Sequence, residues 1–221
     1  MESMFDTLLQ LPLFQGLVHD DFTNILAKVK LHFVKHKGGE VIAQAGDPCD
    51  RLLFILKGAV SVTTVAANRA YLFTEQYEAP CLIEPHSLFG MHTTFASTYT
   101  TVGETHTVCI SKVFVMNELT KYEIFRLNYA NIICNRAQTL QRKLWDINHG
   151  DLYDRIIGFI ASRAERPTGR KSLKIKMEDL AHIVNDTRLN VSRVLNALQS
   201  KELLELRRGE IIVPQLEELT R

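Results

Sequence analysis

Hydrophobic residues recur at spacings of three and four along a stretch without glycine or proline, from Asn117 to about Asn148. Residues at this spacing share one face of an α-helix, so the stretch predicts one helix of about thirty residues with a continuous apolar seam. The seam comprises Ile124, Leu127, Ala130, Cys134, Ala137, Leu140, Leu144 and Ile147. Because a segment with its own predicted core precedes this helix, we expect the seam to pair with the same helix of a second chain.

Short hydrophobic runs separated by turn residues characterise residues 31–115. The runs are rich in valine, isoleucine, threonine and phenylalanine, and Val60 and Val62 alternate with smaller residues, as in a strand with one buried face. Glycines mark several of the turns: Gly38, Gly39, Gly46 and Gly58. The pattern predicts a closed or double-layered antiparallel β domain, preceded by one or two short helices.

After Gly150 the spacing becomes helical again and ends in two short apolar runs. Residues 177–195 match a helix-turn-helix, with Ala181 where the helices cross and Asn185 where the turn requires a left-handed backbone. The following segment, LLELRRGEIIV, predicts a hairpin that turns between Arg207 and Glu210. A helix-turn-helix followed by a hairpin is a winged helix, which makes DNA the expected partner.

The start of the second helix carries side chains where a recognition helix contacts base edges, with Thr187 as its cap. Between residues 170 and 208 basic residues outnumber acidic ones, which favours phosphate contact. The predicted DNA-binding residues are Thr187, Arg188, Leu189, Asn190, Ser192, Arg193, Arg207 and Arg208. Two alternatives remain open: a helix pair that only packs on a core, and a winged helix that contacts protein.

The composition excludes several classes of protein. The 221 residues are 46% hydrophobic and 23% charged, as in an ordinary globular protein, and the net charge of +1 restricts any nucleic-acid surface to a local patch. No apolar run approaches the ~18 residues of a membrane helix. Glu2 and Asp6 stand where a signal peptide carries positive charge. We therefore expect a cytoplasmic protein that does not associate with a membrane.

The residues that could bind metal are scattered. The four cysteines form no C-x-x-C pair, and the eight histidines are spread along the chain. A metal-dependent enzyme built on the β domain would need His and carboxylate ligands in one strand pair. We therefore expect no catalytic residue, no metal site, and neither haem nor an iron–sulfur cluster.

Taken together, the order of elements resembles the Crp/Fnr superfamily of bacterial transcription regulators over nearly the whole chain. KGGEVIAQAGDPCDRLLFILKGAVSV is similar to the family's cyclic-nucleotide-binding β-roll, and NDTRLNVSRVLNALQSKELL is similar to its recognition helix. The resemblance implies an α+β fold with three parts: an antiparallel, jelly-roll-like β-roll with N-terminal helices (1–116), a long dimerisation helix (117–149) and a winged helix-turn-helix domain (150–221). It further implies a homodimer that binds a pseudo-palindromic operator in double-stranded DNA, contacts RNA polymerase and responds to an effector in the β-roll.

The effector segment departs from the family pattern. Cyclic-nucleotide binders of the family use Gly-Glu-Leu for the ribose and Arg-Ser for the phosphate. Here Glu84 is followed by Pro85, and Thr100 and Thr101 stand at the Arg-Ser place, so a cyclic phosphate would lose its cationic partner. We expect Glu84, Thr100 and Thr101 to line a pocket for a small effector that is not a cyclic nucleotide, or for none. The open alternatives are a cyclic nucleotide held by Arg51 or Arg69, by a partner's Arg126, Arg136 or Arg142, and haem-based gas sensing through His86, His92 or His106.

Overall fold

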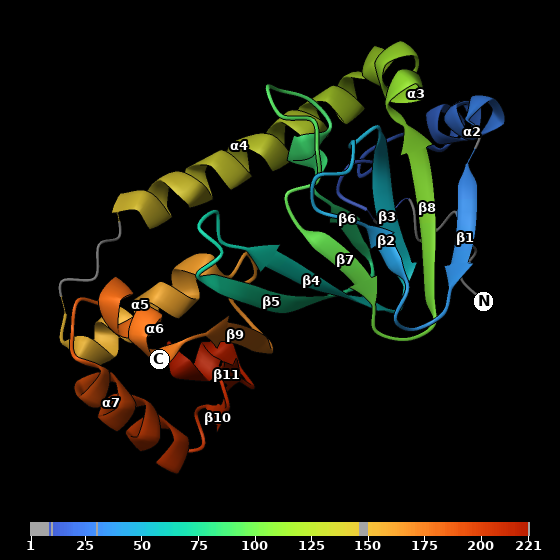
Figure 1. Ribbon diagram of the computed structural model, residues 1–221. Helices are drawn as coiled ribbons and strands as arrows, with labels where there is room; N and C mark the ends of the chain where they lie inside the picture. The colour runs from blue at the N-terminus through green and yellow to red at the C-terminus, as the bar shows by residue number, and fades with distance from the viewer. Residues whose placement is uncertain (1–8, 10, 30, 146–149, 221) are drawn as a thin grey trace. The chain divides into compact units, whose positions relative to one another are not determined.

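The computed structural model (Figure 1) describes residue 9 and residues 11–29, 31–145 and 150–220. The chain divides into two compact units, one formed by residues 1–61 and 77–142 and the other by residues 62–76 and 143–221. Residues 62–76, the tip of a β-hairpin, therefore lie in the second unit, although its first strand begins and its second strand ends in the first unit. No boundary drawn along the chain separates these units.

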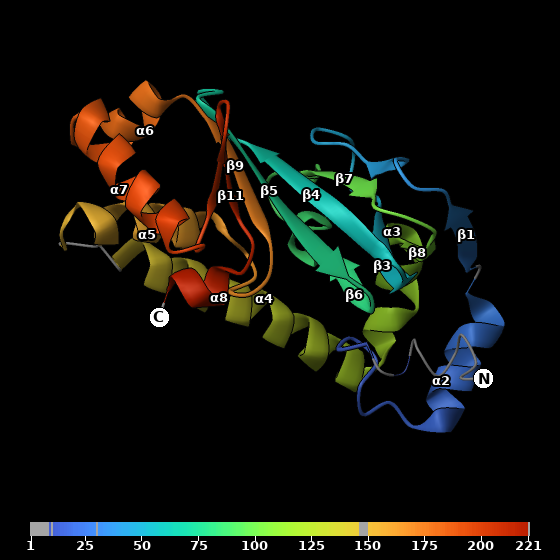
Figure 2. The ribbon, with the colours of Figure 1, turned by 90° about the horizontal axis from the view of Figure 1, so that it is seen from below.

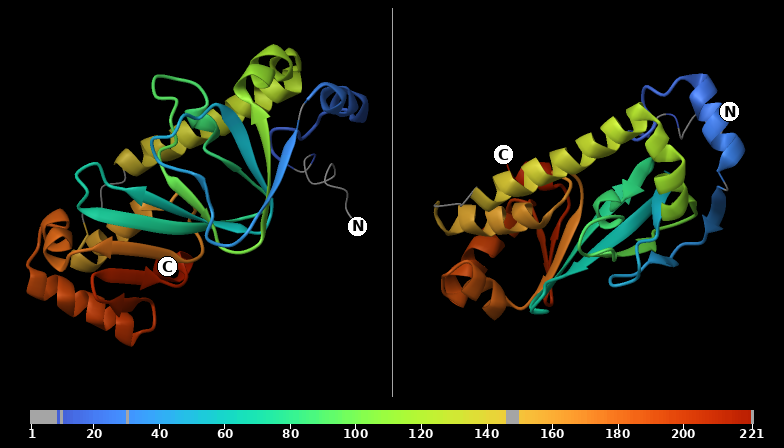
Figure 3. Two further views of the ribbon diagram at one scale, coloured as in Figure 1. Left: turned by 45° about the vertical axis from the view of Figure 1, so that its right-hand side comes forward. Right: turned by 90° about the horizontal axis from the view of Figure 1, so that it is seen from above.

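The first unit contains a β-roll (Figure 3). Its four-stranded antiparallel sheet has the order β1-β8-β3-β6, with bounds β1 His32–His36, β3 Arg51–Lys57, β6 Cys81–Ile83 and β8 Thr105–Ser111. In the second sheet, β2 (Val41–Ala43) pairs with β7 (Thr98–Thr101), and β4 (Ala59–Val65) follows. Strand β3 is buried from Leu52 to Ile55, each at most 2% exposed, because sheet and helices cover both of its faces. These strands confirm the predicted antiparallel β domain.

Short helices close this roll. They are α2 (His19–Lys28), the 3₁₀ turns η1 (Pro85–Ser87) and η2 (Leu119–Lys121), and α3 (Lys112–Asn117). The long helix α4 spans Glu123–Trp145. Its predicted start near Asn117 is wrong, because the chain first makes the η2 turn around the fully buried Leu119 and then extends at Tyr122.

Helix α4 has one face fixed to the roll. Phe125 is 1% exposed and its ring lies 6.2 Å from that of Phe14. The Asn128 side chain donates to the carbonyl of Gln15 (2.8 Å), and the Tyr129 hydroxyl donates to the carbonyl of Pro85 (2.6 Å). The predicted seam lies elsewhere on the helix and is exposed in the single chain, except that Ile147 falls outside the described residues.

The second unit is a winged helix joined to a hairpin (Figure 2). Its helices are α5 (Leu152–Arg163), α6 (Met177–Ile183), α7 (Arg188–Ser200) and α8 (Leu216–Leu219), and its strands are β9 (Lys171–Ile175), β10 (Glu205–Arg207) and β11 (Glu210–Val213). Arg207 pairs with Glu210 across a two-residue turn with Gly209 at φ +73°, which confirms the predicted hairpin. The sequence did not predict β9, which contributes to the sheet order β10-β11-β9-β5.

Strand β5 (Tyr71–Glu78) supplies both a sheet edge and core side chains to this unit. It pairs antiparallel with β9, from Tyr71 opposite Ile175 to Glu75 opposite Lys171. Phe73 is 3% exposed within the core of the winged helix, and the ring of Tyr71 meets that of Phe159 edge to face at 5.4 Å. The hairpin is therefore an integral part of the second unit.

A buried ion pair fixes this junction of strands. Lys171 Nζ lies 3.0 Å from Glu75 Oε2, and the two side chains are only 1% and 6% exposed. Lys171 also donates to the carbonyl of Thr168 (2.9 Å), while the backbone N–H groups of Glu165 and Arg166 donate to the Glu75 carboxylate. These added hydrogen bonds offset the cost of removing both charges from water.

Replacing Lys171 with methionine is expected to lower the free energy of unfolding by about 3–5 kcal/mol, because it leaves the Glu75 carboxylate buried without its cation. The matched control is Lys174→Met on the same strand, where the side chain is exposed and the change should stay within about 0.5 kcal/mol. Urea denaturation of both variants measures the difference. The double variant Glu75→Leu, Lys171→Met should recover part of the loss. Equal unfolding midpoints for Lys171→Met and Lys174→Met would contradict the assignment.

Candidate nucleic-acid interface and effector segment

The packing of α6 on α7 follows the helix-turn-helix pattern. Leu180, Val184 and Val191 are at most 4% exposed, and Ala181, where the helices cross, is 5% exposed. Val194 is partly buried against the same core. These positions confirm the predicted packing face, so the side chains on the other face of α7 are left to solvent.

The turn between the helices has the predicted backbone. Asn185 lies in the left-handed region with φ +51°, which asparagine tolerates better than most residues. Thr187 caps α7, with its Oγ1 accepting from the backbone N–H of Asn190 at 3.2 Å. Both structural predictions are confirmed, and together they set where the recognition helix begins.

Asp186 organises the start of α7. Its Oδ1 accepts from the Asn190 side-chain amide (2.9 Å) and from the Thr187 N–H (2.8 Å), and its Oδ2 accepts from Arg155 Nη2 on α5 (2.8 Å). The Asn190 amide, the Thr187 N–H and Arg155 lower the pKa of this carboxyl, in that order of effect. Sequence reasoning missed both Asp186 and Arg155. The available signal was an acidic residue directly before a helix cap, where the helix dipole favours negative charge.

The predicted base-reading residues lie at the exposed N-terminal part of α7. Leu189 is 61% exposed, Ser192 is half-buried, and the others are exposed; the set is Thr187, Arg188, Leu189, Asn190, Ser192 and Arg193. Arg188 Nη1 lies 3.5 Å from Glu178 Oε1 on α6, and both side chains are more than two-thirds exposed. Such a pair contributes little stability and can give way to a DNA contact.

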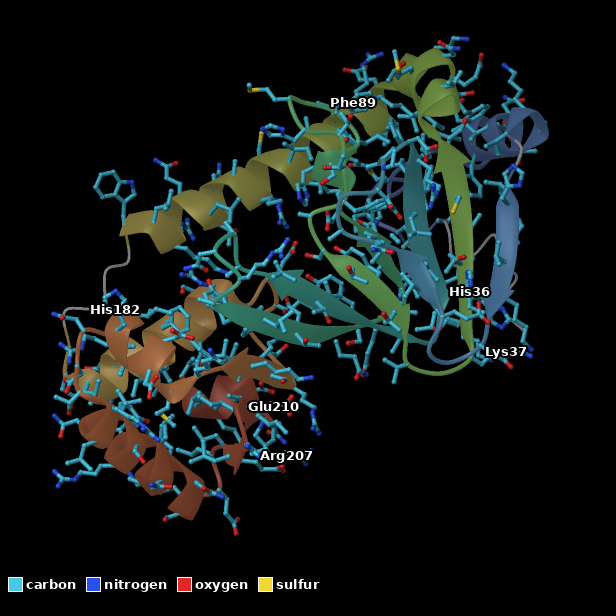
Figure 4. The ribbon with its side chains drawn as sticks, in the orientation of Figure 1. His36, Lys37, Phe89, His182, Arg207 and Glu210 are labelled. Atoms are coloured by element: carbon cyan, nitrogen blue, oxygen red, sulfur yellow. The ribbon has the colours of Figure 1, made fainter. Side chains whose placement is uncertain are left out.

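The wing presents two exposed arginines at its tip, Arg207 and Arg208. Arg207 Nη2 lies 3.2 Å from Glu205 Oε2 on the same strand. Figure 4 labels Arg207 and Glu210, which flank the turn of the wing. Contacts of these side chains with DNA remain predictions.

Glu84 is engaged entirely within the protein. It is 6% exposed with φ +37°, and its Oε2 accepts from Ser87 Oγ and the Ala96 N–H, both at 2.8 Å. Its Oε1 accepts from the Ser97 N–H (3.0 Å) and the Tyr99 hydroxyl (2.9 Å). A carboxylate has about four acceptor sites. In this conformation Glu84 therefore shapes the loop and offers a ligand no further acceptor.

The other two predicted pocket residues lie on β7. Thr101 is 2% exposed, and its hydroxyl donates to the carbonyl of Lys37 and accepts from the N–H of Glu40 (3.0 Å). Thr100 is half-buried. The assignment of these residues to an effector pocket stays a prediction, and the structure assigns Thr101 to holding the β1–β2 turn (residues 37–40).

The candidate metal ligands do not gather in the part of the chain that the structure describes. Its histidines, cysteines and carboxylates form no group of three or more that could hold a metal ion. Burial raises the pKa of Cys49 to about 11 and also raises that of Cys109, which keeps both thiols protonated at neutral pH. Within the same described residues, no helix is long and apolar enough to cross a membrane.

Comparisons with known proteins agree with this architecture. Residues 33–122 match the model of the cyclic nucleotide-binding domain, and residues 154–221 match the Crp-like helix-turn-helix domain. The chain is 23% identical over 200 residues to the global nitrogen regulator of Synechococcus elongatus, an alignment that covers 84% of this chain and 87% of the relative.

Solved structures share the fold. The catabolite activator protein of Thermus thermophilus matches with a TM-score of 0.55 at 19% identity, covering 95% of this chain and 96% of that one. CLP of Xanthomonas campestris, a c-di-GMP-responsive global regulator, matches with a TM-score of 0.52 at 18% identity, covering 89% and 99%. The predicted α+β fold and the predicted resemblance are thereby confirmed. With a cyclic-nucleotide-binding-type β-roll and a winged helix of the matching kind, the chain belongs to the Crp-like family of DNA-binding transcription regulators.

Proposed function

We propose that this chain acts as a homodimer that reads a pseudo-palindromic operator in the cytoplasm and works with RNA polymerase, as a regulator without catalytic activity or a resident metal or haem. The observation that carries the proposal is the two-sided recognition helix. One face of α7 is fully packed through Val191, Leu195 and Leu198, whereas Arg188 and Arg193 project into solvent from the helix whose start is capped and fixed.

The exposed side chains indicate how bases are read. Arginine pairs bidentately with the O6 and N7 atoms of guanine in the major groove, which suits Arg188 and Arg193. Leu189 offers only an apolar contact, for which the thymine methyl group is the matching partner. We therefore propose a half-site with guanine and thymine contacts from these three residues, and backbone contacts from Arg207 and Arg208.

The exposed seam of α4 supports the homodimer. Ile124, Leu127, Leu140 and Leu144 are 38%, 52%, 50% and 76% exposed. Ala130, Cys134 and Ala137 lie exposed between them at the same helical spacing. An uncovered apolar stripe of this length on a helix is typical of a partner interface, and the same helix of a second copy provides a complementary stripe.

The effector segment supports control by a small effector other than a cyclic nucleotide, or by none. The acceptor sites of Glu84 are occupied by internal donors, and Thr101 is occupied by backbone groups. Arg51, one of the arginines considered as an alternative phosphate partner, donates to Asp50 (2.9 Å) and lies 6.0 Å from the ring centroid of Phe95. A cyclic phosphate placed here would pay most of its desolvation cost without a dedicated cation.

Arg193→Ala is expected to cost about 1–3 kcal/mol on the cognate operator and to relax the preference at one base pair. Arg208→Ala serves as the comparison, since loss of a phosphate contact weakens all duplexes equally and lowers the salt slope by about 1. Binding is measured at several salt concentrations on duplexes selected from a random pool. If Arg193→Ala weakens binding to every duplex equally, the Arg193 side chain contacts only phosphate. If the protein selects no duplex from the pool, the partner of the winged helix is a protein instead of DNA.

A charge in the seam is expected to split the dimer. Ala137→Glu places a carboxylate where two copies meet, so sedimentation should show monomers at micromolar concentration, and operator binding should be lost because half-sites about one helical turn apart need two linked domains. Gln138→Glu, exposed on the same helix but outside the seam, should leave both properties unchanged. A wild-type chain that is monomeric and yet binds its operator with full affinity would contradict the proposal.

Calorimetric titration with cyclic AMP and cyclic GMP at millimolar concentration is expected to show no saturable binding, because the segment lacks a phosphate-binding cation. Binding tighter than about 10 µM, or about −7 kcal/mol, would overturn this part of the proposal. Titration of Arg51→Gln would then show whether Arg51 supplies the missing charge.

A further inference from the structure

The second unit contains a groove that the recognition of bases does not use. Its volume is about 320 Å³, and it lies between helix α5 and the turn of the helix-turn-helix. We call it the α5 groove, and its polar lining consists of Lys143, Arg155, Ser162, Arg163 and Asn185. Three of these five side chains are cationic and none is acidic, so the lining among the described residues favours an anion.

Arg155 brings a donor to this groove that has no acceptor. Its Nη2 donates to Asp186 Oδ2 at 2.8 Å, but its Nε is buried and makes no hydrogen bond within the described part of the chain. A buried donor without an acceptor is costly, and in native proteins such a group usually meets a water or an ion. Because Nε is enclosed in this conformation, an oxygen atom bound in the α5 groove would satisfy it after a small rotation of the Arg155 side chain.

The other two cations are held beside it. The guanidinium of Arg163 lies over the ring of Phe159, with its carbon 4.9 Å from the ring centroid, and near the ring of Tyr71 at 5.8 Å. Stacking of this kind fixes the guanidinium plane, and Arg163 Nη1 makes one long contact with Ser162 Oγ (3.5 Å), which leaves the other edge donors available. Lys143 Nζ donates to the carbonyl of Ala164, which anchors the ammonium group at the groove. The positive charge is therefore positioned by contacts within the unit.

We propose that the α5 groove binds a phosphate group, held by Arg155 and Arg163 with Lys143 as a further cation. Arginine is suited to this ligand because its planar fork matches the oxygens of phosphate, and hydrogen bonds between charged partners are the strong ones. The phosphate belongs either to the backbone of bound DNA or to free inorganic phosphate or a phosphate ester. Both sources present the same tetrahedral oxygens.

Phosphate binding in the α5 groove would affect the recognition helix through Asp186. Arg155 holds Asp186, and Asp186 in turn binds the Thr187 N–H and the Asn190 amide at the start of α7. A phosphate oxygen bound to the remaining guanidinium donors of Arg155 would fix the side chain from its other side. The site thus links anion binding to the placement of Asn190, one of the proposed base-reading residues.

The first arm of the test uses inorganic phosphate and the full-length chain at constant ionic strength. Calorimetry is expected to show saturable binding, and the Asn190 side-chain amide resonance should move with the same saturation. Arg163→Gln should weaken phosphate binding at least about tenfold, the minimum for losing one hydrogen bond between charged groups. Arg155→Lys should also weaken it, since lysine keeps the charge but lacks the planar fork of guanidinium donors. Arg170→Gln, exposed and outside the lining, is the matched control.

The second arm identifies a DNA source and depends on the proposed function. If free phosphate does not saturate but Arg163→Gln lowers the slope of log affinity against log salt by about 1 relative to the wild type, the bound phosphate is that of DNA. If phosphate saturates and the slope is unchanged, the ligand is a free phosphate or ester. The inference is overturned if phosphate does not show saturable binding and both Arg163→Gln and Arg155→Lys bind DNA as the wild type does. A chain that binds no DNA at all would refute the proposed function, and the phosphate titration alone would then decide the inference.

Discussion

The buried pair of Glu75 and Lys171 is the constraint on which the second unit depends. Two charges that are almost completely removed from water are tolerated only when each keeps its partners, so β5 must remain paired with β9. That pairing brings Phe73 into the core of the winged helix and Tyr71 against Phe159. Strand β4 begins, and strand β5 ends, in the unit that contains the β-roll. The residues of the β-roll and those of the DNA-binding unit are therefore interleaved in sequence.

The effector segment and the recognition helix differ in how far internal hydrogen bonds occupy their polar side chains. In the effector segment, Glu84 collects four internal donors, which stabilises a closed loop in a strained, left-handed backbone. At the recognition helix, Asp186 and Thr187 satisfy the start of α7 while the neighbouring arginines remain exposed. The first arrangement uses its polar groups for structure. At the recognition helix, the polar groups of Asp186 and Thr187 hold the helix end, and the long cationic side chains remain exposed for a partner.

Features with local causes could be predicted from the sequence. The left-handed turn at Asn185, the cap at Thr187 and the hairpin at Gly209 each depend on one residue type at one place, and the apolar spacing identified the packed face of α7. Features with non-local causes could not. Helix α4 starts late because Leu119 is buried by other elements, and β9 becomes a strand because β5 and β11 lie on either side of it. The donors to Glu84 come from as far away as Tyr99, so its saturation was invisible along the chain.

The pairing of β5 with β9 also limits how the DNA-binding unit can be transferred from one protein to another. A fragment that starts at Asp151, directly before α5, would lack β5. Strand β9 would then become a sheet edge with unpaired N–H and C=O groups, and Lys171 would be buried without its carboxylate partner. Exposed edges of this kind promote aggregation. A functional chimera with another regulator of this family would therefore have to transfer residues 62–76 together with the C-terminal domain, as two separate pieces of chain that form one folding unit.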